Sequence, residues 1–323
     1  MFTIRDYLEK VKPALESAFN RELSGLIGNI KSKDTVSLMS TLEAGKKIRG
    51  CLSCMVNEAL GGAFEAAIPR AVAVELIQAA TLIHDDFVDQ DTLRRNRPAA
   101  WTLEGARRAV LIGDVIFAAA IKMMNDISRA DSEAVIHAIV QLSRGALHEP
   151  LDPFALSREI EANRLGRQLY EEIIHLKTGI LFGTACELGA IAAKAGSKMR
   201  KMSYRYGMRI GEAYQIADDA KEVRQHLLTR SIQPEQMAAL APAFLYFANG
   251  KHLSLLPLLK GESIGLNNPA LEFFGPMVDL MENEIEQRLQ SAVSEIGDYF
   301  PENGYSVLIR EAPWDIIKMF KES

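Results

Sequence analysis

A long apolar segment that ends in a cluster of carboxylates constrains the fold of this chain more than any other feature. The run 71–83 is mostly apolar, contains no Gly or Pro, and gives way to the carboxylate-rich stretch 85–91. Val72, Leu76, Ile83 and their apolar neighbours occupy too many angles for one face of a surface helix. The pattern therefore predicts a helix that is buried among other elements.

The acids of this stretch stand at the C-terminal end of the predicted helix. Asp85 and Asp89 are four residues apart and project from nearly the same face. The helix dipole disfavours each carboxylate there by about 0.3–1 kcal/mol, and the adjacent Asp86 adds repulsion. A hard divalent cation relieves both effects, and oxygen ligands without a nearby Cys indicate Mg²⁺. A solvated acidic helix end is the alternative for one such cluster taken alone.

A second acid pair, Asp218-Asp219, favours the metal hypothesis. It follows the stretch 201–217, in which Ile210 and Tyr214 recur at helical spacing. If both helices end at their acid pairs and these ends face each other, the acids form one anionic cavity. Such a cavity requires several cations, which would recruit a diphosphate.

Nearly every other segment also has the pattern of a helix. Ala, Leu, Glu, Arg and Met dominate the chain, and alternating β-rich runs are missing. The sequence therefore predicts an all-α fold, a single domain over residues 1–323 with its site between facing helices. Breaks between helices are expected near Gly45, Gly61-Gly62, Arg97-Pro98, Pro150 to Pro153, Ala195-Gly196, Gln233-Pro234, Asn249-Gly250 and Asn267 to Pro269.

Composition excludes several classes of function. A net charge of −5 argues against nucleic acid as a partner. Three cysteines suggest no disulfide framework, and the pair Cys51 and Cys54 lacks nearby His partners for zinc. No secretory h-region is present, and no apolar run reaches the roughly 18–20 residues of a membrane span. We therefore expect a cytoplasmic protein without stable membrane insertion.

Five motifs, in order, resemble those of the trans-isoprenyl diphosphate synthases, the polyprenyl synthetase family. They are Gly45-Lys46-Lys47-Ile48-Arg49, Asp85-Asp86-Phe87-Val88-Asp89 with Arg94-Arg95, Gly113-Asp114, His175-Leu176-Lys177-Thr178-Gly179, and the segment from Gly211 to Asp219. The resemblance implies an all-α helical bundle of the isoprenoid synthase type with a central active-site cavity. It also implies Mg²⁺ as the cofactor and a homodimer as the usual assembly.

The resemblance further implies a reaction and a set of site residues. In this family an allylic diphosphate ionises and the double bond of isopentenyl diphosphate attacks the cation, which gives a longer all-trans polyprenyl diphosphate. Metal ligands are expected at Asp85, Asp86, Asp89, Asp218 and Asp219. Substrate contacts are expected at Lys46, Arg49, Gln78, Arg94, Arg95 and Lys177. The catalytic set is Asp85, Asp86, Asp89, Arg94, Lys177, Thr178 and Gln215, whereas His84 is expected to be a packed helix residue.

The chain departs from the family pattern at several positions. Gln78 stands where most relatives carry His, so it can donate a hydrogen bond but carries no charge. In the second motif Glu222 replaces a third Asp, and Lys221 is expected to bring a cation beside the metal. The stretch 223–237 lacks the family's Gly-Lys-rich loop, which normally helps to close the site.

Two small residues, Ala80 and Thr81, precede Asp85 by about one helical turn. Relatives with short products carry an aromatic residue at one of these positions, so this chain is expected to make products longer than geranylgeranyl diphosphate. Two other functions remain open. One is a prenyltransferase or terpene-synthase-like enzyme that uses a different acceptor, and the other is a partner subunit of a heteromeric synthase.

Overall fold

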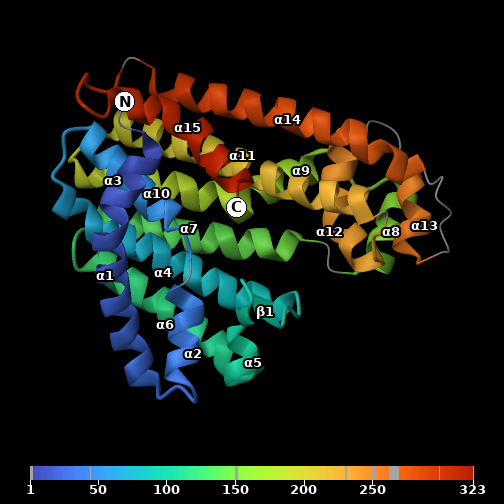
Figure 1. The fold of residues 1–323 in the computed structure, drawn as a ribbon, viewed down its shortest axis with the longest axis horizontal. Coiled ribbons are helices and arrows are strands. Elements are labelled where there is room, and N and C mark those ends of the chain that lie inside the picture. Colours follow the sequence, from blue (N-terminus) through green and yellow to red (C-terminus); the bar gives the residue numbers. More distant parts are fainter. Residues whose placement is uncertain are drawn as a thin grey trace. The chain divides into compact units, whose positions relative to one another are not determined.

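The computed structural model describes residues 3–43, 45–149, 152–229, 231–248, 252–261, 269–297 and 299–322. Helices make up nearly all of these ranges (Figure 1). The α-helices are α1 (Ile4–Ile30), α2 (Thr35–Glu43), α3 (Ile48–Ala59), α4 (Phe64–Val88), α5 (Ala100–Glu104), α6 (Ala106–Asn125), α7 (Arg129–His148), α8 (Pro153–Glu161), α9 (Gln168–Ile173), α10 (Ile180–Ala192), α11 (Ser197–Thr229), α12 (Pro234–Phe247), α13 (Leu256–Leu259), α14 (Pro269–Ile296) and α15 (Ser306–Lys321). A π-helical turn, η1 (Ile174–Gly179), joins α9 to α10, and a 3₁₀ turn, η2 (His252–Leu255), precedes α13.

The predicted all-α class is confirmed, with one small exception that the sequence analysis missed. Strands β1 (Leu93–Arg94) and β2 (Arg97–Pro98) form a short antiparallel hairpin. Its two-residue turn is Arg95-Asn96, with φ of 52° and 61°. Positive φ at both central residues is typical of the turn that matches the right-handed twist of paired strands. The hairpin holds the arginine pair directly after the acids of α4.

The chain divides into two compact units, and neither is a continuous stretch of sequence. Unit 1 comprises Met1–Val140, Leu181–Gly207 and Glu295–Ile316, and unit 2 comprises Gln141–Ile180, Met208–Ser294 and Ile317–Ser323. We describe each unit by itself. The expectation of a single domain over residues 1–323 stays a prediction.

Unit 1 is built around α4, as the apolar run predicts. Val72, Leu76 and Ile83 are at most 1% exposed, and the helix packs against α1, α3 and α6. An 18-residue window of α4 is apolar enough to cross a membrane by length and composition, so the expectation that no segment meets this test is wrong. Since 67% of that window is buried inside the structure, α4 serves as the core helix of unit 1.

The two cysteines of the C-x-x-C pair belong to the same core. Cys51 and Cys54 lie on α3, are fully buried, and form no disulfide. Burial raises the pKa of both thiols, so neither is poised to act as a thiolate. The interpretation of this pair as a buried helical turn is confirmed.

Unit 2 has an aromatic core. Tyr170 on α9 packs against Tyr246 and Phe247 of α12, with ring centroids 5.4 and 5.9 Å apart. Phe244 of the same helix contacts Phe273 and Phe274 of α14. These rings hold α9, α12 and α14 together beside the second acid motif.

The predicted helix breaks are confirmed wherever the structure describes them, and one expected helix end is wrong. Pro150, Asn249-Gly250 and the Asn at 267 lie outside the described residues.

Helix α11 does not end at Asp218-Asp219 but continues to Thr229. Nothing between 218 and 229 breaks a helix, since the stretch lacks Gly and Pro. The second acid pair therefore lies within a helix, not at its end.

Candidate active site

The first acid motif occupies the last turn of α4, as predicted. The helix ends at Val88, and the Asp89 N–H donates to the Asp85 carbonyl at 2.8 Å. Asp85 is half-buried and Asp89 is exposed. These two carboxylates therefore project from one face at the negative end of the helix dipole, where a cation is favoured.

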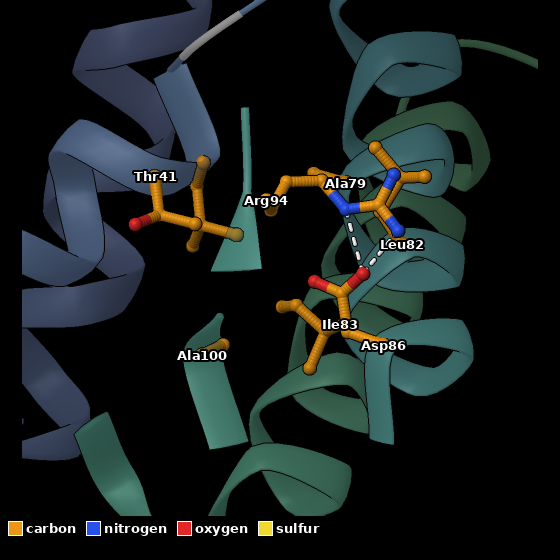
Figure 2. A pocket seen from close by; sticks show the side chains of 8 residues that line it. Thr41, Ala79, Leu82, Ile83, Asp86, Arg94 and Ala100 are labelled. Atoms are coloured by element: carbon orange, nitrogen blue, oxygen red, sulfur yellow. Dashed lines mark hydrogen bonds and ion pairs between the residues drawn. The ribbon is translucent and has the colours of Figure 1, made fainter. Parts of the chain in front are cut away.

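Asp86 has a different environment from its two neighbours. It is 2% exposed, and Arg94 Nε donates to its Oδ1 at 2.6 Å, with Nη2 donating to the same oxygen. Figure 2 shows this ion pair beside a small pocket. The pocket is lined by Thr41, Leu42, Ala79, Leu82, Ile83, Asp86, Arg94 and Ala100. The structure thus pairs two predicted site residues with each other, and their roles as metal ligand and diphosphate contact stay predictions.

The basic motif and Arg95 lie together. At Gly45, with φ of 148°, an added Cβ would lie 2.9 Å from Arg95 Nη1, so the guanidinium packs directly on this glycine. Lys47 is only 5% exposed, and its Nζ lies 3.6 Å from the Phe19 ring centroid. Burial lowers the pKa of Lys47, and the charge of Arg95 lowers it further. The sequence analysis chose Lys46 and Arg49 but missed Lys47, which is buried and is not part of a solvated turn.

Two further residues of the basic region are also positioned by packing. The Arg49 guanidinium lies 4.5 Å from the Phe182 ring centroid. Gln78 is half-buried on α4, and its carbonyl accepts a hydrogen bond from the Thr81 hydroxyl at 2.9 Å. Gln78 precedes Asp85 by seven residues, or about two turns, so both lie on one face of α4.

His84 is a packed residue, as expected. Its Nε2 donates to the Val110 carbonyl at 3.0 Å, and its ring meets Phe117 edge-on at 5.5 Å. A Cβ at Gly113 would lie 2.2 Å from that nitrogen. This close approach explains why the Gly113-Asp114 motif requires glycine.

The second motif forms a hydrogen-bonded chain within unit 2. The Thr178 hydroxyl donates to Gln215 Oε1 at 2.6 Å, and Gln215 Nε2 donates to Asp219 Oδ1 at 2.9 Å. The Tyr170 hydroxyl donates to the other oxygen, Oδ2, at 2.6 Å. Three predicted site residues are therefore brought together, and Asp218 stands exposed beside them. Tyr170 was missed, although it lies seven residues, about two turns, before Lys177.

Burial changes the acidity of Asp219. It raises the pKa of this carboxyl to about 7, and the hydrogen bonds from Tyr170 and Gln215 offset only part of the rise. Asp219 is desolvated and both of its carboxyl oxygens accept hydrogen bonds, whereas the side chain of Asp218 is exposed. The arrangement suits Asp219 to orienting Gln215 and Thr178.

Lys177 and Thr178 lie in the π-helical turn η1. Such single turns are rare and occur frequently at functional sites. Lys177 Nζ donates to Glu149 Oε2 at 2.8 Å. Within the turn, His175 Nδ1 lies 3.2 Å from Glu212 Oε1. Glu212 is 2% exposed and also accepts hydrogen bonds from arginines of α11 and α14. Although burial opposes its ionisation, these partners hold the pKa of Glu212 below its usual value. This buried ionic cluster holds the turn in place.

The departures in the second motif have clear structural positions. Lys221 is exposed, and its Nζ lies 5.5 Å from the Phe320 ring centroid on α15. Glu222 is half-buried, and burial raises the pKa of its carboxyl. One turn further, His226 is 6% exposed, with Nε2 3.6 Å from Glu222 Oε1.

The donor atoms fit a hard divalent cation. Within the described ranges no three His, Cys, Asp or Glu side chains are arranged to hold a metal ion. Mg²⁺ usually takes only one or two carboxylates and completes its shell with water and substrate phosphate. Asp85 with Asp89, and separately Asp218, offer such carboxylates.

Comparison with known proteins agrees with these motifs. The model of the polyprenyl synthetase family matches residues 35–227. A geranylgeranyl pyrophosphate synthase of Geoglobus acetivorans is 31% identical over 179 residues, which are 55% of this chain and 56% of that protein. A geranylfarnesyl diphosphate synthase of Aeropyrum pernix is 35% identical over 186 residues, which are 54% of this chain and 56% of that protein. The chain thus matches little more than half the length of these relatives.

The fold is also shared with solved structures. A polyprenyl synthase from Caulobacter crescentus CB15, complexed with calcium and isoprenyl diphosphate, gives a TM-score of 0.74 at 22% identity and covers 97% of each chain. This likeness concerns the fold alone. The family model, in contrast, covers more than half of the 323 residues and includes all five motifs. The chain belongs to the polyprenyl synthetase family.

Proposed function

We propose that this protein is a head-to-tail prenyltransferase, which condenses an allylic diphosphate with isopentenyl diphosphate to make a longer all-trans polyprenyl diphosphate. The observation that carries the proposal is that Arg95 packs on Gly45 of the basic motif and its charge acts on Lys47, in the same unit as the acids of α4. An acceptor that is itself a diphosphate needs such direct cationic contacts. The names of the relatives support the same reaction.

In this proposal the acidic residues serve the allylic substrate. Asp85 with Asp89 in unit 1, and separately Asp218 in unit 2, would hold Mg²⁺, which would supply positive charge for the departing diphosphate. Lys177, whose ammonium donates to Glu149 in the structure, would share that charge. The C–O bond to the diphosphate breaks, and the electron pair leaves with the diphosphate oxygen. In a site without water, each preorganised charge of this kind stabilises the transition state by on the order of a few kcal/mol.

The hydrogen-bonded chain of the second motif orients the dipoles that would face the allylic cation. Because Gln215 Nε2 donates to Asp219, its Oε1 is turned toward Thr178. The Thr178 proton is therefore committed to Gln215, and the hydroxyl's lone pairs remain available to positive charge. The new C–C bond forms from the double bond of isopentenyl diphosphate, and loss of one proton completes the transfer.

The decisive assay uses purified protein, Mg²⁺, dimethylallyl, geranyl or farnesyl diphosphate in turn, and labelled isopentenyl diphosphate. Products are sized as alcohols after phosphatase treatment. We expect label in alcohols that are longer than the starter by whole five-carbon units. Hydrocarbons formed without isopentenyl diphosphate would indicate a terpene-synthase-like enzyme. Activity that appears only after a second protein is added would indicate a subunit of a heteromeric synthase.

We further propose that the products are longer than geranylgeranyl diphosphate. Thr81 is half-buried and lies on the same face of α4 as Asp85, whereas Ala80 is fully buried. Both are small, and one relative is named for a geranylfarnesyl product. Thr81→Phe is therefore the better probe. Ala80→Phe would overpack the core and lower the free energy of unfolding by about 1–3 kcal/mol. We expect Thr81→Phe to shorten the product, and an unchanged length would reject this route for the hydrocarbon.

A cytoplasmic homodimer is part of the same proposal. Helices α6 and α7 expose large apolar side chains at four-residue spacing, namely Leu111 and Val115 on α6 and Ile136 and Val140 on α7. Exposed apolar side chains in such rows are typical of association surfaces. Light scattering on purified protein, with Leu111→Glu and Ile136→Glu as disrupting variants, measures the assembly.

A further inference from the structure

Glu75 is a buried carboxylate of α4 that the proposed reaction does not use. It is 6% exposed and lies among the apolar residues of the core helix of unit 1. Its Oε1 accepts a hydrogen bond from the Gly50 N–H at 2.7 Å. A buried carboxylate is costly unless its surroundings compensate for the lost hydration. The partners of Glu75 therefore indicate what this residue does.

Helix α3 lacks the usual cap at its N-terminus. The first N–H groups of a helix have no acceptor within the helix, and the N-cap side chain usually accepts from the second or third of them. The N-cap of α3 is Lys47, whose φ is 53° and whose side chain makes no cap hydrogen bond. Gly50 is the third residue of α3, so Glu75 supplies from α4 the acceptor that Lys47 does not. A carboxylate in this place also faces the positive end of the helix dipole.

The glycine at position 50 permits this contact between the two helices. A Cβ there would lie 3.1 Å from Glu75 Cγ, 3.2 Å from the Ala71 carbonyl oxygen and 2.7 Å from Leu15 Cδ2. Packed atoms rarely come so close. The first turn of α3 is therefore held against α4 by close packing as well as by the hydrogen bond.

The capped turn carries the basic motif. Lys46 and Lys47 directly precede α3, and Arg49 is its second residue. Burial lowers the pKa of Lys47, and the charge of Glu75 is the largest effect that opposes this change. On α4 itself, Glu75 precedes Gln78 by three residues, so the two side chains are neighbours on the helix surface. Glu75 thus connects two groups of residues that are expected to contact the acceptor.

We propose that Glu75 is a positioning residue of the acceptor site, which caps α3 and so holds the cations of the basic motif in the geometry that receives a diphosphate. It acts as a hydrogen-bond acceptor, because its charge alone would repel a diphosphate. The inference rests on the proposed function for the identity of the acceptor, isopentenyl diphosphate. The cap itself is testable with inorganic pyrophosphate.

Two conservative variants separate the hydrogen bond from the charge. Glu75→Gln keeps an oxygen that accepts from the Gly50 N–H but removes the charge. Glu75→Asp keeps the charge but is shorter by one carbon–carbon bond, about 1.5 Å, which takes its oxygens out of hydrogen-bonding range. The same two substitutions at Glu104, which is 1% exposed and accepts the Lys33 N–H at 2.8 Å, are the matched controls.

Calorimetry measures the binding of inorganic pyrophosphate to the full-length proteins in EDTA. We expect Glu75→Asp to weaken binding about 10-fold, Glu75→Gln to change it less than about 3-fold, and both Glu104 variants to match the wild type. Lys46→Gln should also weaken binding, which assigns the anion to the basic motif. The proposal is overturned by undiminished affinity in Glu75→Asp or in Lys46→Gln, by a larger loss in Glu75→Gln than in Glu75→Asp, or by a wild type that binds no pyrophosphate.

Steady-state prenyl transfer separates positioning from a general loss of stability. We expect Glu75→Asp to raise the KM for isopentenyl diphosphate about 10-fold, while kcat and the KM for the allylic diphosphate change less than about 3-fold. A variant that only folds less well would lower kcat and leave both KM values unchanged, and that result overturns the proposal. Pyrophosphate binding that depends on the cap, without any prenyl transfer, rejects the proposed reaction and keeps the cap. Transfer with an unchanged KM for isopentenyl diphosphate rejects the cap alone.

Discussion

The acid cluster at the end of α4 and the acid cluster within α11 stabilise their carboxylates by different means. At the end of α4 the helix dipole opposes negative charge, and the one buried acid, Asp86, is compensated by an ion pair with Arg94. Asp219 lies within α11 and not at its end, and it is held by hydrogen bonds from Tyr170 and Gln215. The first cluster is thus organised by charge, and the second by neutral donors.

This difference separates the two regions in function. The helix dipole disfavours the carboxylates of Asp85 and Asp89 at the end of α4, and we propose that a metal ion offsets this cost. Asp219 has a structural role, because it fixes the orientation of Gln215 and through it Thr178. Substitutions in the two regions should therefore differ in kind, and the following predictions are ordered from the largest expected effect to the smallest.

Asp85→Ala should give the largest loss of turnover, at least roughly 100-fold in kcat. The reason is that it removes a carboxylate that we propose as a metal ligand. Steady-state prenyl transfer with saturating Mg²⁺ measures it. A loss below about 5-fold would show that the acids of α4 do not serve the reaction.

Gln215→Leu should lower kcat by roughly 10-fold to 100-fold, less than loss of a metal ligand. It breaks the chain from Thr178 to Asp219, so the hydroxyl is no longer oriented. The dependence of the rate on Mg²⁺ concentration should stay that of the wild type. A changed Mg²⁺ dependence would place Gln215 with the metal and erase the distinction between the two regions.

Asp219→Asn should change how stability depends on pH. The folded-state pKa is about 7, above the ordinary value of 3.8. The folded protein therefore holds this proton more tightly, and between these values the free energy of unfolding falls as pH rises. The variant should lose this contribution, so its free energy of unfolding relative to wild type should rise from about pH 5 to about pH 7.5. Urea unfolding in EDTA measures it, and a constant difference between the two proteins would contradict the raised pKa.

Lys221→Leu should have the smallest effect. The sequence alone suggests a cation that competes with metal, but Lys221 is exposed and directed at Phe320. We expect kcat and the Mg²⁺ requirement to change by less than about 2-fold, as for most surface substitutions. A large gain in activity or in Mg²⁺ affinity would restore the competing-cation hypothesis.

Much of unit 1 could be predicted from sequence because its signals are local. The apolar run of α4, its acids, and the glycine-marked breaks depend on residues close in sequence, and the structure has them as expected. The hairpin that carries Arg94 and Arg95 was missed, because its strands are only two residues each and show no alternation.

The contacts of the second motif depend on residues far apart in the chain. Tyr170 reaches Asp219 across 49 residues, and no periodicity near either position indicates that pairing. The end of α11 was misplaced because charged residues were taken as a stop signal, although charged residues without Gly or Pro continue a helix. Lys47 was missed because its burial depends on Phe19, which lies on another helix and far away in sequence.

The central claim is that the acids at the end of α4 serve a metal ion and not stability. Thermal melts of wild type and Asp85→Ala, each with EDTA or with Mg²⁺ and pyrophosphate, test it most directly. With EDTA the variant should melt at or above the wild-type temperature, because a carboxylate repelled by the helix end and by Asp86 is gone. With Mg²⁺ and pyrophosphate at about 100 times their dissociation constant, the wild type should gain roughly 5 °C and the variant far less. A variant that melts clearly below wild type in EDTA, or that gains as much from Mg²⁺ and pyrophosphate, would contradict the account.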